Sequence, residues 1–165
     1  MARINLHNNL RNAVNVSCGL IKMKDILLKD VMVTNPHILN IDDPFSMVEE
    51  YFHMYNIRHL PVVDKDGILK GIITQRDLYR IRSPMKTMEG EAFYDRVDLN
   101  RFILKYVMTK DPFTLHPDDT LREAINAMVK QKYGCIPIVN DENKLLGIVT
   151  QIDALRVVAK EYLKL

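Results

Sequence analysis

Cysteine is rare in this chain, and tryptophan is absent. The 165 residues include two cysteines, Cys18 and Cys135, which form no CxxC pair and show no metal-ligand spacing. A disulfide framework is therefore not expected, and a reducing, cytoplasmic location is favoured. The longest apolar runs fall well short of the roughly 20 residues that a membrane-spanning helix needs. The residues before Cys18 are too polar for a signal peptide, so we expect no membrane association.

Motifs that carry catalysis or bind metals are also missing. No phosphate-binding loop of the type Gly-x-x-x-x-Gly-Lys-Ser/Thr and no Gly-x-Ser-x-Gly elbow occurs, so we do not expect an enzyme. The five histidines are scattered and are not paired with cysteines or carboxylates, which argues against a metal site. A net charge of +2 makes nucleic-acid binding unlikely as the main function.

An internal repeat dominates what is present. The segment Gly-Ile-Ile-Thr-Gln-Arg-Asp at 71–77 returns as Gly-Ile-Val-Thr-Gln-Ile-Asp at 147–153, an offset of 76 residues that also relates Pro36 to Pro112. The register holds without gaps from Leu28 onward, which indicates a true duplication. With 47% hydrophobic and 27% charged residues, the chain has the composition of a globular protein.

Each repeat has the pattern β-α-β-β-α. We expect extended segments at 37–41 and 113–115, followed by helices that begin after the aspartate pairs 42–43 and 118–119. Strands are expected at 60–63 and 69–73, and again at 136–139 and 145–149, with closing helices at 74–82 and 150–163. The fold class is α/β, with two repeats packed face to face about a pseudo-twofold axis, because one repeat alone cannot bury its sheet.

These patterns divide the chain into four parts. Residues 1–24 form an N-terminal extension, 25–82 the first repeat, 83–100 a linker with one helical turn, and 101–165 the second repeat, which opens with a helix near 101–106.

The ordered motifs resemble a known family. The first repeat carries Val-Met, Asn-Pro, Asp-Asp, Ile-Arg-His-Leu-Pro-Val-Val-Asp and the segment at 71–77. The second carries Val-Met-Thr-Lys-Asp-Pro, Cys-Ile-Pro-Ile-Val and the segment at 147–153. Together they resemble a tandem pair of cystathionine-β-synthase (CBS) domains, or Bateman module, over residues 26–160. The resemblance implies a regulatory sensor that binds AMP, ADP, ATP or S-adenosylmethionine between two sheets, forms a homodimer and signals to a regulated protein.

The resemblance also implies which residues bind the ligand. Asp77 and Asp153 would bond the ribose hydroxyls, and Thr74 and Thr150 would help to hold the phosphate. Each of these residues is equally suited to capping a helix, so both roles stay open.

The remaining candidates belong to the phosphate and base ends of such a ligand. The basic candidates are Arg58, His59 and Arg76, and the base-pocket candidates are Ile38, Val62, Thr114 and Ile138. The basic ones could lie in a solvated loop, and the base-pocket ones are equally good core residues.

The two copies differ in charge. Arg58-His59 is replaced by Gly134-Cys135 in the second copy, and Asp153 has no basic neighbour in its own repeat. We therefore expect two unequal sites, with a weak or uncharged ligand near Asp153. The alternative function is a structural or dimerisation module without a physiological nucleotide.

Overall fold

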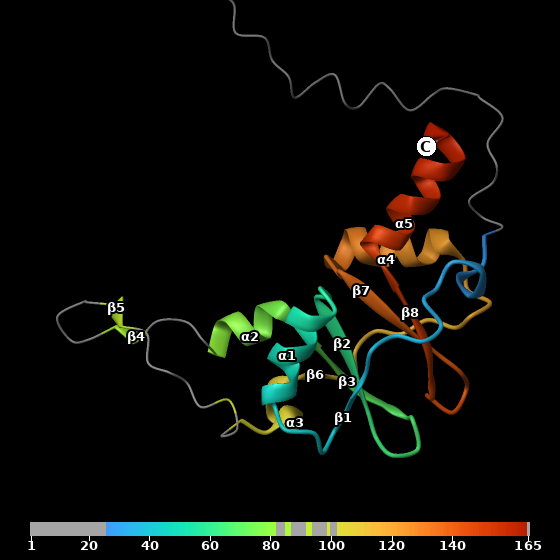
Figure 1. The fold of residues 1–165 in the computed structure, drawn as a ribbon. Helices are drawn as coiled ribbons and strands as arrows, with labels where there is room; N and C mark the ends of the chain where they lie inside the picture. The colour runs from blue at the N-terminus through green and yellow to red at the C-terminus, as the bar shows by residue number, and fades with distance from the viewer. Residues whose placement is uncertain (1–25, 82–84, 87–91, 94–98, 100–101, 165) are drawn as a thin grey trace, which may run out of the picture.

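Two α/β halves lie one above the other in this protein, and each corresponds to one repeat (Figure 1). The structure is a computed structural model that describes residues 26–81, 85–86, 92–93, 99 and 102–164. The extension 1–24, including Cys18, lies outside the described residues. The expected α/β class with two β-α-β-β-α repeats is confirmed. None of the described helices is long and apolar enough to cross a membrane.

The first half is built on a four-stranded sheet in the order β1-β2-β3-β6. Its strands are β1 (Leu39–Asn40), β2 (His59–Val63), β3 (Leu69–Thr74) and β6 (Thr109–Lys110). Its helices are α1 (Ser46–Met54), α2 (Gln75–Ile81) and α3 (Leu104–Val107). The β1–β2 pair is parallel, and the other two pairs are antiparallel.

The second half repeats this plan. A short 3₁₀ helix (Leu28–Asp30) belongs to the first repeat in sequence but packs in this half. Its strands are β7 (Cys135–Val139) and β8 (Leu145–Thr150), and its helices are α4 (Leu121–Gln131) and α5 (Gln151–Val158). A π-helical turn (Ala159–Leu163) extends α5 toward the C-terminus.

The repeats exchange edge strands. β6, which comes from the second repeat, pairs with β3 of the first through Ile72 and Thr109. In return, Val33 of the first repeat pairs with Ile148 on β8, with N–H···O distances of 2.9 and 3.0 Å. Each β-hairpin therefore has its outer edge covered by backbone from the other repeat, which satisfies amide and carbonyl groups that would otherwise be unpaired.

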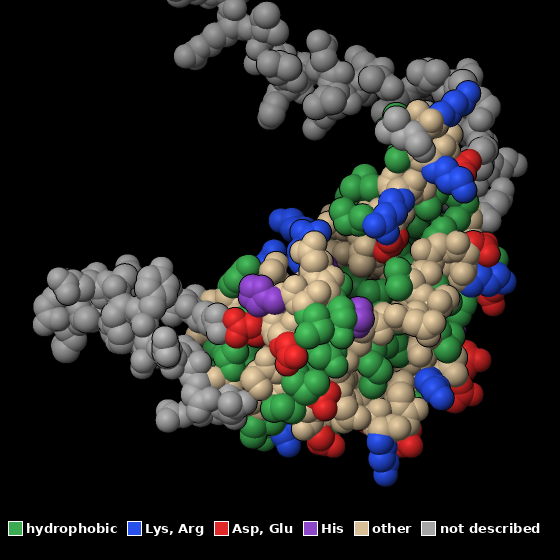
Figure 2. Space-filling model, in the orientation of Figure 1, with side chains coloured by type: hydrophobic (Ala, Val, Ile, Leu, Met, Phe, Trp, Pro, Cys, Tyr) green, Lys and Arg blue, Asp and Glu red, His purple; other side chains and the backbone are tan. Residues whose placement is uncertain are grey.

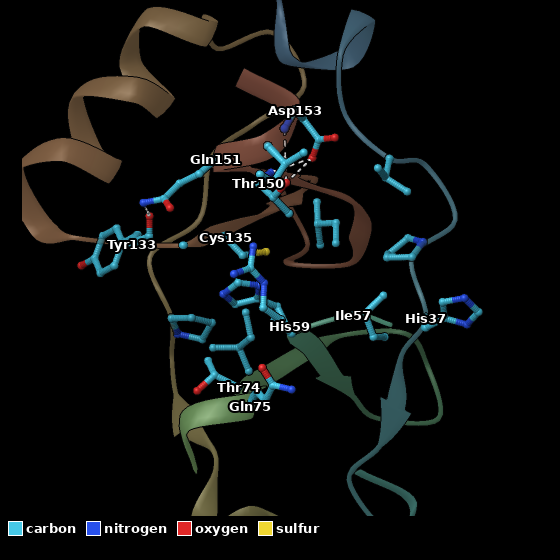
Figure 3. Close-up of a pocket in the computed structure, with 18 of the residues that line it drawn as sticks. His37, Ile57, His59, Thr74, Gln75, Tyr133, Cys135, Thr150, Gln151 and Asp153 are labelled. Carbon is cyan, nitrogen blue, oxygen red and sulfur yellow. Dashed lines mark hydrogen bonds between the residues drawn. The ribbon is translucent and has the colours of Figure 1, made fainter. Parts of the chain in front are cut away.

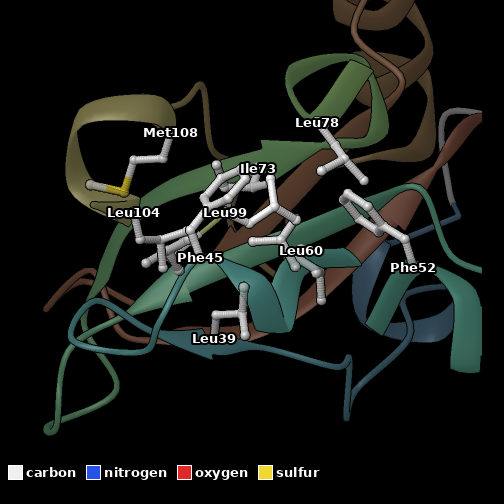
Figure 4. Close-up of a cluster of buried hydrophobic side chains, with 11 residues drawn as sticks. Leu39, Phe45, Phe52, Leu60, Ile73, Leu78, Leu99, Leu104 and Met108 are labelled. Carbon is white, nitrogen blue, oxygen red and sulfur yellow. The ribbon is translucent and has the colours of Figure 1, made fainter. Parts of the chain in front are cut away.

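Two separate hydrophobic cores fill the halves. The first lies between its sheet and α1, α2 and α3, and includes Phe45, Leu60 and Ile73 (Figure 4). The second lies between the β7–β8 hairpin and helices α4 and α5, and includes Leu121 and Ile136. The cleft described below lies between the two repeats and is lined by residues of both.

Several local expectations were wrong in detail. The aspartate pairs do not cap the first helices; Asp43 and Asp119 instead accept bonds from the amides of Asn40 and His116. Helix α4 is capped by Thr120, whose hydroxyl accepts from the Glu123 amide in a capping box. The aspartates lie too early in the chain to reach the first helical amides.

The linker contains more than the expected single helical turn, although Leu99 does lie in a 3₁₀ turn. Its described part contains two short strands, β4 (Met85–Lys86) and β5 (Ala92–Phe93), which pair in an antiparallel ribbon. Leu99 is buried in the first core. The helix expected at 101–106 is α3, which begins three residues later at Leu104.

Close packing at Gly147 makes the strand exchange between the repeats testable. A Cβ atom on Gly147 would lie 2.6 Å from the carbonyl oxygen of Val33 and 3.0 Å from the Met32 sulfur. Because backbone cannot yield as a side chain tip does, Gly147→Ala should lower the free energy of unfolding by about 1–3 kcal/mol. Urea denaturation measures this value. Asn126→Ala, at an exposed position on α4, is the control, and a Gly147→Ala variant as stable as this control would contradict the strand exchange.

Candidate functional site

A cleft of about 1050 Å³ lies between the two repeats. Figure 3 shows Thr150 and Asp153 at one end, Thr74 and Gln75 at the other, and His59 and Cys135 between them. The hairpins of both repeats end here, since β3 and β8 each run into a helix at this point. The repeats therefore bring their matching Thr-x-x-Asp segments to one cavity.

The threonine and aspartate of each segment bond to one another. The Asp153 Oδ2 atom accepts from the Thr150 amide at 2.9 Å and from the Thr150 hydroxyl at 2.6 Å. The Thr150 hydroxyl oxygen also accepts from the Asp153 amide at 3.3 Å, which completes a capping box at the start of α5. Asp77 and Thr74 make the first two bonds at 2.9 and 2.7 Å. Both repeats thus share the bonds from the threonine to the aspartate, and α5 has the complete capping box.

The two aspartates differ in their position relative to the cleft. Asp153 lines the cleft although it is 7% exposed, whereas Asp77 is not among the lining residues. Thr74 and Thr150 both line it. The first repeat therefore presents its threonine to the cavity without its carboxylate.

A basic residue one helical turn beyond Asp153 corrects a sequence expectation. The Arg156 Nη1 atom donates to Asp153 Oδ1 at 2.9 Å, so Asp153 does have a basic neighbour in its own repeat. Arg80 is its equivalent in the first repeat, 3.7 Å from Asp77 Oδ1. The signal was present in the sequence, because residues three apart on a helix lie on the same face.

His59 lies at the boundary between the repeats. A Cβ atom on Gly134 would lie 2.6 Å from its Nε2 atom, so the imidazole occupies space that the glycine leaves free. Burial lowers the pKa of His59 below its ordinary value, and the charge of Arg58 lowers it further. The imidazole is therefore held in its neutral form at neutral pH. His59 thus faces Gly134, the residue that takes the place of its neighbour Arg58 in the second repeat.

Cys135 lies beside His59 in the cleft wall (Figure 3). Burial raises the pKa of its thiol to about 12, and the charge of Asp153 contributes in the same direction. A thiol with this pKa forms almost no thiolate at neutral pH and is a poor nucleophile. Within the described ranges no cluster of histidine, cysteine and acidic side chains could hold a metal ion.

The other predicted residues divide into two groups. Arg58 and Arg76 line the cleft. The four base-pocket candidates do not: Val62 and Ile138 are fully buried in the two cores, Ile38 is exposed and Thr114 is half-buried outside the lining. Side chains alternate along a strand, so Val62 shares the core-facing side of β2 with Leu60 and is opposite His59.

Aromatic side chains of the cleft wall were not predicted. Phe113 and Tyr133 both line the cleft and stack at a centroid distance of 5.6 Å, with planes inclined by 19°. At the position equivalent to Phe113, His37 lines the cleft and stacks on Tyr55 at 3.6 Å. The 76-residue offset pairs His37 with Phe113, and this pairing of two ring side chains could have identified them in the sequence.

Comparison with known proteins agrees with this architecture. The model of the CBS domain matches residues 28–83 and 104–160. The chain belongs to the CBS domain family. A CBS domain-containing protein of Dictyostelium discoideum is 30% identical over 136 residues, covering 82% of this chain and 92% of that protein.

Other CBS proteins in the comparison are larger or were solved with ligands. Inosine-5'-monophosphate dehydrogenase of Methanocaldococcus jannaschii is 33% identical over 82% of this chain, which corresponds to 23% of that enzyme. The CBS domain pair of protein MJ0100, solved with 5'-methylthioadenosine and S-adenosyl-L-methionine, has a TM-score of 0.66 and 26% identity. The match covers 82% of this chain and 97% of that one.

The lowered pKa of His59 predicts a specific response to acid. Its folded pKa lies below the ordinary 6.5, so the unfolded chain takes up a proton first as the pH falls. Stability contributed by the neutral imidazole is present above pH 6.5 and is lost below it, by at most about 1.4 kcal/mol per pH unit.

Urea denaturation at about pH 7.5 and about pH 5.5 tests this. His59→Gln should lose less stability on acidification than wild type, while His53→Gln, at an exposed position on α1, should behave like wild type. An equal loss in wild type and His59→Gln would contradict the assignment.

Proposed function

We propose that this CBS pair is a regulatory sensor that binds an adenosine-containing ligand in its central cleft. The observation that carries the proposal is the Asp153 carboxylate, which lines the cleft at the start of α5 and is held there by Thr150. A carboxylate in this position accepts hydrogen bonds from the hydroxyls of a ribose.

The rest of the cleft suits the other parts of such a ligand. Amides at the start of α5 and the guanidinium groups of Arg58 and Arg76 favour a phosphate. The rings of Phe113 and Tyr133 provide a flat apolar surface on which a base can stack. A volume of about 1050 Å³ is at the upper end of the range typical for small-molecule sites, roughly 300–1000 Å³.

A solved relative supports the adenosyl class. The CBS pair of MJ0100 is bound to 5'-methylthioadenosine and S-adenosylmethionine, two compounds that share adenosine and differ in charge. We infer that AMP, ADP, ATP or S-adenosylmethionine, rather than an unrelated metabolite, occupies this cleft.

The position of the aspartates favours one ligand per chain. Asp153 lines the cleft and Asp77 does not, so the second repeat supplies the ribose contact. Arg58 from the first repeat lies in the same cleft as Asp153 and supplies a charge that Gly134 lacks, while His59 contributes a neutral imidazole.

We propose binding rather than catalysis. The thiol in the cleft wall has a pKa of about 12 and the neighbouring His59 is held neutral by burial, so this pair does not form a thiolate–imidazolium nucleophile.

Residues 33–37, here called the N-terminal arm, offer a route for the signal. The arm crosses from α1 to β8, where Val33 pairs with Ile148, and it lines the cleft up to His37. Because His37 stacks on Tyr55 directly after α1, a ligand that shifts the arm shifts the end of this helix. A regulated partner would read that change.

The proposed function includes formation of a homodimer. The alternative function, a dimerisation module without a nucleotide ligand, depends on the same dimer. Helices α4 and α5 expose large apolar side chains, including Val129 (73% exposed), Leu155 (61%) and Ile152 (43%). Hydrophobic and basic side chains lie together over this region in Figure 2. Exposed apolar groups that gather on adjacent helices indicate an interaction surface, and a second copy is the partner we infer.

The dimer proposal predicts the effect of one added charge. Leu155→Glu should shift the protein from dimer to monomer, because burying an unpaired carboxylate in an interface costs several kcal/mol. Sedimentation velocity measures the distribution. Lys164→Glu, at an exposed position beyond α5, is the control, and a Leu155→Glu protein that stays dimeric would place the interface elsewhere.

Ligand binding is tested by calorimetric titration with adenosine, AMP and S-adenosylmethionine. Wild type should bind at least one of them with one ligand per chain. Asp153→Asn should weaken binding about 10- to 100-fold, the value of a hydrogen bond to a charged group.

Asp77→Asn is the matched control, because it removes the equivalent carboxylate outside the cleft and should change the affinity less than threefold. Equal losses in the two variants would contradict the placement of the ligand. No heat with any ligand, from protein that unfolds cooperatively in urea, would favour the dimerisation module.

A further inference from the structure

The Asp153 carboxylate has most of its acceptor positions occupied within the protein. A carboxylate offers about four lone-pair positions, two on each oxygen. The amide and hydroxyl of Thr150 occupy two on Oδ2, and Arg156 occupies one on Oδ1 at 2.9 Å. About one position therefore remains, while a ribose diol donates two hydrogen bonds.

The first repeat provides an internal comparison. Asp77 has the same two bonds from Thr74. The Arg80 Nη1 atom lies 3.7 Å from Asp77 Oδ1, beyond hydrogen-bond distance, so this arginine occupies neither position on Oδ1. A hydrogen bond from the arginine to Oδ1 is thus present at Asp153, which lines the cleft, and absent at Asp77.

Arg156 can leave Asp153 without disturbing the fold. Its side chain is 74% exposed, whereas that of Asp153 is 8% exposed. The carboxylate is fixed by the helix cap, while the guanidinium is held by one ion pair that faces solvent and also lines the cleft. An exposed pair of this kind contributes about 0.2–1 kcal/mol and is weakened by salt.

We propose that Arg156 is a latch on the ligand site. In the empty protein it bonds Asp153 Oδ1, and a ligand diol must displace it to gain its second hydrogen bond. Arg156 thereby lowers the affinity for the adenosyl ligand and sets the threshold at which the sensor responds. The inference rests on the proposed function, since it assigns the diol to Asp153.

Adenosine is the probe for this latch, because it carries no charge and so does not interact with Arg156 through a phosphate. Arg156→Met keeps the length and apolar stem of the side chain and removes the donor. Calorimetric titration should show adenosine binding about two- to fivefold tighter in Arg156→Met than in wild type, and Arg156→Lys should restore much of the difference.

Arg80→Met is the matched control and should bind adenosine like wild type, because its arginine lies outside hydrogen-bond distance of Asp77. Salt gives a second readout. Raising NaCl from about 50 mM to about 500 mM should tighten adenosine binding to wild type and leave Arg156→Met unchanged.

The outcomes separate the latch from the function on which it rests. Equal or weaker adenosine binding by Arg156→Met, or the same gain in Arg80→Met, overturns the latch while the binding function stands. A lack of binding of adenosine, AMP and S-adenosylmethionine by both wild type and Arg156→Met overturns both.

Discussion

The backbone pairing between repeats is the constraint on which the rest of this structure depends. Val33 completes the edge of β8, and β6 completes the edge of β3, so neither hairpin has a finished outer edge within its own repeat. Gly71 and Gly147 stand where the foreign strands approach, because a side chain there would meet backbone within 3 Å. The two halves are fixed in orientation by hydrogen bonds as well as by apolar contact.

This orientation places the start of α2 and the start of α5 at one cavity. The Thr-x-x-Asp segment would cap its helix in any setting, because the threonine and aspartate satisfy each other and the first amides. The exchange of strands adds a wall from the opposite repeat, including the N-terminal arm up to His37. A local capping device thereby becomes part of a shared site. The two repeats differ at this site. His59 of the first repeat faces Gly134 of the second, and Asp153 lines the cleft whereas Asp77 does not.

Much of the fold could be predicted from the sequence, because strands, helices and the 76-residue offset are local or periodic signals. The strands containing Leu60 and Ile136 begin within one residue of the expected bounds. The exchange could not be predicted from periodicity, since a strand pattern does not state its partner. The core positions of Val62 and Ile138 depend on which side of each strand the helices cover. The Arg156–Asp153 bond had a helical-spacing signal, but its contrast with Arg80 and Asp77 depends on side-chain geometry that the spacing does not determine.

Strand exchange also bears on how such a chain could arise. A single unit of the length of one repeat would carry an arm with no sheet to join and a hairpin with an open edge, which invites pairing with another chain. Two such units could pair around a true twofold axis, with the arm of each unit completing the open hairpin edge of the other, as the two repeats do here. A single repeat would therefore be expected to fold as a homodimer. In a single chain each copy can change separately, and one position of the repeat is histidine in the first copy (His59) and cysteine in the second (Cys135).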